Sequence, residues 1–146
     1  MSANKYLIFE LGTEKYAVYA LAVKEVMGKS GITRLPDAPE HITGVCGVRG
    51  RIVPVYDLKS KLGIEPAENP SGCIIIIEAS DKTLGVAADA VLSVSEFRRE
   101  EIEPVPGFNN NRYLTGYVKH NDDYIWLINT NVLFESYHLH EMESIL

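Results

Sequence analysis

The sequence predicts a mainly β fold made of two similar units, and three observations support this. Short runs rich in Ile, Val and Tyr alternate with Gly, Asn, Asp and Pro, as is typical of strands joined by tight turns. The first part of the chain also resembles the second part. The helical candidates are brief, which excludes a parallel βαβ fold and leaves small barrels or a sandwich.

The resemblance between the two parts is an internal repeat. YLIFELGTEKYAVYALAVKEV, residues 6–26, aligns without a gap on IIIIEASDKTLGVAADAVLSV, residues 74–94. With a few residues of loop slippage, residues 43–58 then align on residues 115–130. We therefore predict a single domain over residues 1–146, with repeat units at about 6–64 and 73–134. The polar, proline-containing segment 65–72 is the expected linker.

We expect strands at five short apolar runs, which are residues 6–11, 16–20, 51–58, 73–79 and 124–129. Segment 20–27 is ambiguous between helix and strand. LKSKL follows Asp57 as a helix cap and ends at Gly63, and an amphipathic C-terminal helix is expected at about 131–145. Pro54 lacks an amide proton, so we expect the amide side of residue 54 at a sheet edge, at a bulge or facing solvent.

Charge and hydropathy limit the partners. The net charge is −6 and the basic residues are not clustered, which argues against nucleic acid and anionic lipid. No run approaches the roughly 20 apolar residues of a membrane span. The N-terminal residues do not have the pattern of a secretory signal. We expect a cytoplasmic protein with no direct insertion into the membrane.

An enzyme is a weaker hypothesis. A thiol nucleophile would need Cys46 or Cys73 beside a histidine, but the four histidines form no recognised signature with either cysteine. His138 and His140 would lie about 200° apart on a helix, which disfavours a shared metal. GVCGVRG lacks the ending of a phosphate-binding loop. We predict no catalytic residue, no metal and no cofactor. A ligand-binding barrel is a third hypothesis, but small barrels are usually filled by side chains, so the sequence predicts no cavity for a ligand.

Several motifs resemble the CheW-like domain family of bacterial chemotaxis coupling proteins. They are FELGTEKYAVYALAVKEVMG, ITRLPDAPEHITGVCGVRGRIVPVYDLKSKLG, LGVAADAVLSV, EEIEPVPGF and YLTGYVKHNDDYIWLIN, and they extend over nearly the whole chain. The resemblance implies two SH3-like five-stranded β-barrels related by the internal duplication, and a non-catalytic scaffold. The implied partners are the cytoplasmic tip of a chemoreceptor and the regulatory domain of the histidine kinase CheA, in receptor arrays at the inner face of the membrane. An adaptor of a pathway for surface motility or development is the alternative.

The same resemblance implies site residues. Arg49 and Glu25 match receptor-facing positions of the family, where a guanidinium and a carboxylate can approach each other. The other positions implied for receptor binding are Val23, Gly44, Val91 and Val94, and those implied for kinase binding are Gly85 and Gly116. The chain departs from the family at Cys46, Gly47 and Val48, before Arg49. Arg49 is also absent from the second unit, where Asn121 aligns with it.

Overall fold

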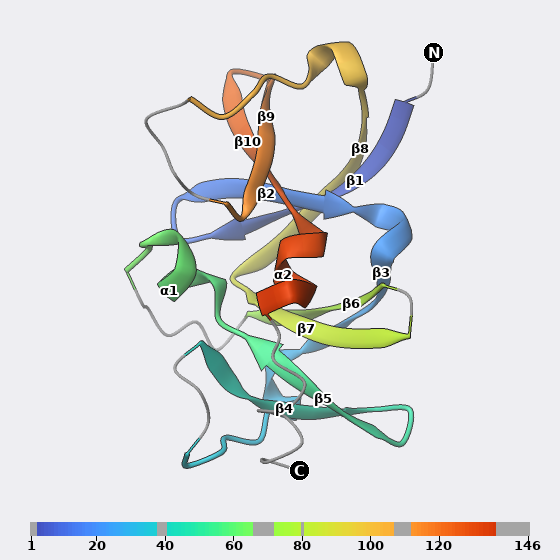
Figure 1. Ribbon diagram of the computed structural model, residues 1–146, viewed down its shortest axis with the longest axis vertical. Helices are drawn as coiled ribbons and strands as arrows, with labels where there is room; N and C mark the ends of the chain where they lie inside the picture. The colour runs from blue at the N-terminus through green and yellow to red at the C-terminus, as the bar shows by residue number, and fades with distance from the viewer. Residues whose placement is uncertain (1–2, 38–40, 66–71, 80, 107–111, 137–146) are drawn as a thin grey trace.

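The computed structural model describes residues 3–37, 41–65, 72–79, 81–106 and 112–136. Two five-stranded sheets make up this part of the chain (Figure 1). We call the first the β1 sheet, with the order β8-β1-β2-β10-β9, and the second the β6 sheet, with the order β3-β6-β7-β5-β4. The mainly β class and the two sets of five strands expected from the sequence are confirmed.

The strands of the β1 sheet are β1 (Ala3–Leu11), β2 (Glu14–Tyr19), β8 (Ala90–Arg98), β9 (Leu114–His120) and β10 (Asp123–Ile128). Those of the β6 sheet are β3 (Val23–Gly28), β4 (Ile42–Val48), β5 (Arg51–Tyr56), β6 (Cys73–Ala79) and β7 (Lys82–Ala88). Short 3-10 helices η1 (Ala20–Ala22), η2 (Lys29–Gly31) and η3 (Arg99–Glu101) follow β2, β3 and β8. Segment 20–27 thus begins as η1 and continues as β3.

The two repeat units exchange strands. Hairpin β1–β2 of the first unit lies in the sheet of β8, β9 and β10, and hairpin β6–β7 of the second unit lies in the sheet of β3, β4 and β5. One parallel pair in each sheet joins the units, β2 with β10 and β5 with β7. Neither unit therefore forms a sheet from its own strands alone.

The repeat is also visible in single hydrogen bonds. Asp57 N donates to His41 O at 2.8 Å, and the equivalent Asn129 N donates to Tyr113 O at 2.7 Å. Each bond fixes the residue that directly follows β5 or β10, just before a helix. The internal duplication inferred from the sequence therefore includes the hydrogen bond that fixes the residue before each of these helices.

The core has three parts. The largest cluster contains residues of both sheets and of the helices that follow β5 and β10, including Phe9, Leu58, Ile77 and Leu133. A second cluster, with Ile8 and Ile125, belongs to the β1 sheet, and a third, with Val53 and Ile76, belongs to the β6 sheet. Because side chains alternate along a strand, Ile76 and Ile77 belong to different clusters.

Helices α1 (Leu58–Leu62) and α2 (Thr130–Ser136) occupy equivalent places after β5 and β10. Asp57 caps α1 by accepting a hydrogen bond from Lys59 N at 3.0 Å, and Gly63 ends it with a φ of 70°, which confirms the limits expected for LKSKL. The side chains of Leu133 and Phe134 are buried in the largest cluster. The part of the expected C-terminal helix beyond residue 136 lies outside the described residues. In the described part of the chain, no helix has the length and apolar character of a membrane span.

Candidate binding site

The turn between β4 and β5 consists of Arg49 and Gly50, with φ angles of 51° and 80°. Two successive positive φ angles in a two-residue hairpin turn are typical of type I′, whose twist matches that of the strands. The turn between β9 and β10 is its equivalent, because Asn121 and Asp122 have φ angles of 50° and 67°. The alignment of Arg49 with Asn121 therefore holds at the level of the backbone.

Arg49 is directed from this turn to the edge strand β3. Its Nε lies 3.8 Å from Oε1 of Glu25, and the two side chains are 77% and 36% exposed. An exposed pair of this kind stabilises a fold by about 0 to 1 kcal/mol. The structure thus brings together the two charged residues that the family resemblance singled out, in a place where both remain accessible to a partner.

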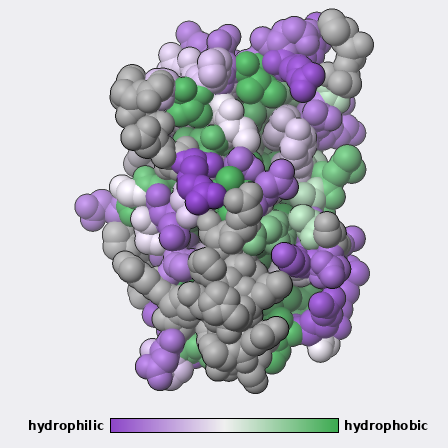
Figure 2. Space-filling model, in the orientation of Figure 1, coloured by the Kyte–Doolittle hydropathy of each residue, from purple (hydrophilic) through white to green (hydrophobic). Residues whose placement is uncertain are grey.

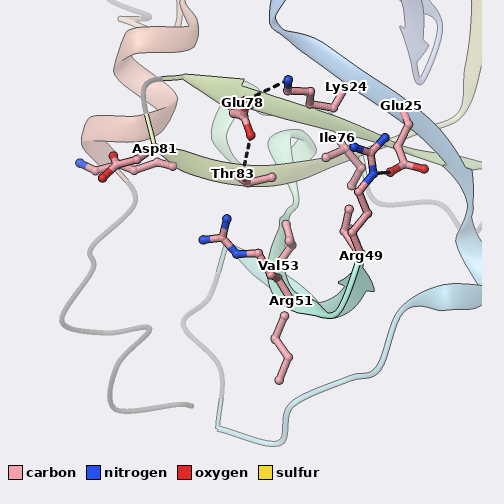
Figure 3. A pocket seen from close by; sticks show the side chains of 12 residues that line it. Lys24, Glu25, Arg49, Arg51, Val53, Ile76, Glu78, Asp81 and Thr83 are labelled. Atoms are coloured by element: carbon pink, nitrogen blue, oxygen red, sulfur yellow. Dashed lines mark hydrogen bonds and ion pairs between the residues drawn. The ribbon is translucent and has the colours of Figure 1, made fainter.

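A groove of about 240 Å³ lies beside this pair (Figure 3). Val48, Val53 and Ile76 supply its apolar lining, and all three belong to or pack against the third cluster. Across the groove, Lys24 Nζ pairs with Glu78 Oε1 at 3.1 Å, and Thr83 Oγ1 donates to Glu78 Oε2 at 3.5 Å. The groove is therefore an apolar floor with charged walls.

Val23 and Glu25 lie on opposite faces of the β6 sheet, although only one residue separates them. A register irregularity lies between them, since Val23 pairs with Ile77 and Glu25 pairs with Ile76. Val23 packs against the largest cluster, whereas Glu25 lines the groove. The family resemblance assigned both residues to receptor binding, and in the structure they lie on opposite faces of the β6 sheet.

Val91 and Val94 lie on β8 of the other sheet. Val91 packs against the same cluster as Val23. Val94 pairs with Leu7, which belongs to that cluster, but its own side chain is 54% exposed. Of the residues expected at the receptor surface, Arg49 and Glu25 lie at the groove. Val23 and Val91 pack against the cluster shared by the two sheets, and Val94 is exposed on β8.

Gly44 and Gly116 are equivalent residues at which two chain segments meet closely. A Cβ at Gly44 would lie 2.3 Å from Thr33 O, and one at Gly116 would lie 2.6 Å from Glu103 O. Beside Gly44, the backbones of Thr33 and Val45 exchange hydrogen bonds of 2.7 and 2.9 Å. Both glycines are buried, so they shape the backbone and present no side chain to a partner.

Gly85 has a similar role in β7. A Cβ there would lie 2.8 Å from Cγ2 of Ile74, a fully buried residue of the third cluster. Gly85 also pairs with Val55 in the parallel ladder between β5 and β7. Its position requires the absence of a side chain, so any influence on kinase binding acts through the packing of the β6 sheet.

Of the residues that line the groove, sequence reasoning named only Arg49 and Glu25 as site residues, and those it missed include Arg51, Ile52 and Lys82. Ile52 is 57% exposed, and large apolar residues on other strands, such as Val94 at 54%, are exposed as well. The signal that could have found Arg51 is the two-residue turn, because such a turn places Val48 opposite Arg51 at the groove.

Both thiols are poorly suited to nucleophilic chemistry. Burial raises the pKa of the Cys46 thiol, and the Glu25 carboxylate raises it further. Burial also raises the pKa of Cys73, with a second contribution from Asp89. Because the thiolate is the nucleophile, both shifts reduce reactivity at neutral pH. Among the described residues, no group of three or more His, Cys, Asp and Glu could hold a metal ion.

Exposed apolar residues occur on several elements. On the face shown in Figure 2, hydrophobic residues are visible in separate places between hydrophilic ones. Among the described residues, the most exposed large apolar side chains include Leu21 at 96%, Ile52 at 57% and Val94 at 54%. Apolar residues scattered singly over a surface are normal in folded proteins, so this distribution alone does not mark a binding surface.

Comparisons with known proteins place the chain in a family. Residues 5–138 match the family described as CheW-like domain. The chain is 35% identical to the chemotaxis protein CheW of Klebsiella aerogenes, over 77% of this chain and 70% of that protein. It is 27% identical to the chemotaxis protein CheW of Helicobacter pylori, over 85% of this chain and 77% of that protein.

A solved structure shows the same architecture. The crystal structure of the scaffolding protein TtCheW from Thermoanaerobacter tengcongensis superposes with a TM-score of 0.81 at 32% identity, over 88% of this chain and 86% of that chain. The match to the family description extends over nearly the whole chain. The chain therefore belongs to the CheW-like domain family.

Proposed function

We propose that this protein is a non-catalytic adaptor that couples chemoreceptors to a histidine kinase in bacterial chemotaxis-type signalling. The observation that supports this most strongly is the agreement with a scaffolding protein of the same family along nearly the whole chain, in sequence and in fold. Chemotaxis proteins of several bacteria are relatives over most of its length. The raised pKa of both thiols supports a role without catalysis.

The receptor surface that we propose has two parts. Arg49 and Glu25 supply charged groups at the groove, where the guanidinium can exchange its distant carboxylate for one on a receptor helix. Val23, Val91 and Val94 supply apolar contacts near the junction of the two sheets, and apolar contacts contribute most of the binding energy in such interfaces. Gly44 keeps β4 close to the segment at Thr33 and so positions the hairpin that bears Arg49.

The second partner is the regulatory domain of the kinase CheA. Gly85 and Gly116 lie in different sheets, and each permits a close approach that a side chain would prevent. We assign them to the kinase surface as residues that set its shape. The location that follows is the cytoplasm, at receptor arrays on the inner face of the membrane.

The test is a pair of binding titrations. The purified protein is titrated with a receptor cytoplasmic fragment and with a kinase regulatory domain, as wild type, as Arg49→Ala and as Asn121→Ala. Asn121 is the matched control because it has the same position and φ in the equivalent turn. Arg49→Ala should weaken receptor binding by about 2 kcal/mol if Arg49 is a hot spot, and Asn121→Ala should not.

Each outcome has a distinct meaning. If the wild-type protein binds neither partner, the coupling function is refuted. If Arg49→Ala binds the receptor fragment as wild type does, only the role of that residue is refuted. The two pathways expected from the sequence are distinguished by motility: a deletion strain defective in swimming chemotaxis supports the flagellar pathway, and one defective only on surfaces supports the alternative.

A further inference from the structure

The internal duplication provides a comparison for the groove within the same chain. Asp123 begins β10 directly after the Asn121-Asp122 turn, as Arg51 begins β5 after the Arg49-Gly50 turn. In the repeat alignment, Lys15 of β2 corresponds to Thr83 of β7. Lys15 and Asp123 form an ion pair between neighbouring strands of the β1 sheet.

The β6 sheet cannot form this pair, because its two positions hold Arg51 and Thr83. The threonine is short and uncharged, and its hydroxyl donates to Glu78. Both residues line the groove. Figure 3 shows the Arg51 side chain in the space between β5 and Thr83, apart from the Arg49–Glu25 pair. The β1 sheet thus has the Lys15–Asp123 ion pair at this place. The β6 sheet has Arg51 and Thr83 at the equivalent positions, and these two residues line an open groove.

The charges around the groove are unevenly matched. Its carboxylates Glu25 and Glu78 are paired with Arg49 and Lys24. Arg51 and Lys82 also line the groove, and the ion pairs of the described residues include neither of them. Asp81, on the turn before β7, is the remaining acidic group of the lining. In a chain of net charge −6, the lining of this groove has four basic and three acidic side chains, a small positive excess beside apolar groups.

The size of the groove indicates the kind of occupant. Its volume of about 240 Å³ is below the roughly 300 to 1,000 Å³ of pockets that enclose small molecules. A groove of this size suits one or two side chains of a protein partner. Its exposed Ile52 offers an apolar contact, and Arg51 offers a planar fork that matches a carboxylate.

We propose that Arg51 and Lys82 bind a carboxylate on the receptor segment, whose neighbouring apolar side chain packs on Ile52. The receptor is the occupant because the groove contains Arg49 and Glu25, so the inference rests on the proposed function. Arg51 is then a specificity-determining residue: it favours a segment with an acidic side chain, since burying an unpaired guanidinium under a neutral one would be unfavourable.

The first experiment measures the affinity of the receptor cytoplasmic fragment for wild type, Arg51→Gln, Lys82→Gln and Lys119→Gln. Lys119 is the matched control, an exposed lysine on β9 of the other sheet. We expect Arg51→Gln to weaken binding about fivefold to tenfold and to reduce its dependence on salt, with a smaller effect at Lys82 and none at Lys119.

The second experiment introduces into the β6 sheet the equivalent of the Lys15–Asp123 ion pair of the β1 sheet. The double variant Arg51→Asp with Thr83→Lys should retain the stability of the wild type and bind the receptor fragment at least about tenfold more weakly. Kinase-domain binding reports whether the variant is folded.

If wild type binds the receptor fragment and both Arg51 variants bind it equally well, this inference is refuted and the coupling function stands. If wild type does not bind the receptor fragment, the proposed receptor coupling fails, and this inference fails with it.

Discussion

The Lys59 ammonium lies 2.9 Å from Oδ1 of the Asp89 carboxylate, and the two side chains are only 11% and 15% exposed. The other oxygen of Asp89 accepts a hydrogen bond from Gly12 N at 2.6 Å. Gly12 lies in the turn of the β1 sheet's hairpin β1–β2, whereas Lys59 lies in α1, which follows β5 of the β6 sheet. One carboxylate therefore joins the two sheets.

Removing this carboxylate should destabilise the protein. Asp89→Ala removes the carboxylate that pairs with the largely buried Lys59 ammonium and that accepts from Gly12 N, so we expect a loss of about 3 kcal/mol in the free energy of unfolding. Urea denaturation measures it. Asp123→Ala is the control, because its ion pair with Lys15 is more exposed and should contribute less than about 1 kcal/mol. Equal losses for the two variants would contradict the assignment.

Gly44 and Gly47 are three residues apart on β4 but should respond differently to alanine. A methyl group at Gly44 would collide with Thr33 O, whereas one at Gly47 would have no atom within 4 Å. We expect Gly44→Ala to lower the free energy of unfolding by about 2 to 3 kcal/mol and Gly47→Ala to leave it nearly unchanged. Thermal unfolding of both variants measures the difference, and a Gly44→Ala protein as stable as wild type would disprove the close approach.

Periodicity and repeats predicted much of the fold. The gapless alignment of residues 6–26 on 74–94 predicted that β1 and β2 are equivalent to β6 and β7. Both pairs of strands form hairpins, and hairpin geometry depends on local turn residues. The capped helix after Asp57 was also predictable from its neighbours. The exchange of hairpins between the units was not, since strand partners distant in sequence are chosen by packing rather than by local propensity.

Pro54 shows the limit of local reasoning. Its missing amide proton predicted that its amide side would lie at an edge, at a bulge or facing solvent, and the ladder between β5 and β7 begins only at Val55. The burial of Pro54 in a strand between β4 and β7 was not predictable from the missing proton. The candidate site had a similar limit: sequence placed Arg49 and Glu25 together, but it could not foresee that an irregularity in β3 turns Val23 to the opposite face.

The Arg49 turn should be stabilised by a residue that suits its backbone. Arg49 has a φ of 51°, which side chains other than Asn, Asp and Gly seldom adopt, and Gly50 follows it. Arg49→Asn creates Asn-Gly, the sequence favoured in type I′ turns, so we expect a gain of about 0.5 to 1 kcal/mol. The same variant should bind the receptor fragment more weakly. A variant that loses stability would contradict the turn assignment, and unfolding and binding measured on one preparation test both expectations.

The thiols of Cys46, which is buried, and Cys73, which is partly buried, should make the protein less stable in alkali. Burial, with Glu25 as a second cause, raises the pKa of Cys46, and burial with Asp89 raises that of Cys73. In the unfolded chain both thiols ionise near their ordinary pKa of about 8.5, while the folded chain keeps its protons. The unfolded state therefore binds fewer protons above that pH, and stability falls as the pH rises.

The double variant Cys46→Val with Cys73→Val isolates this contribution. Its free energy of unfolding should decline less than that of wild type between pH 8 and about 10, where the unfolded thiols ionise. At pH 8, a thiol reagent should label the wild-type cysteines more slowly in the native state than in urea, because both native thiols remain protonated and Cys46 is also buried. Rapid native labelling of Cys46 would overturn the proposed inertness and reopen a thiol-dependent activity.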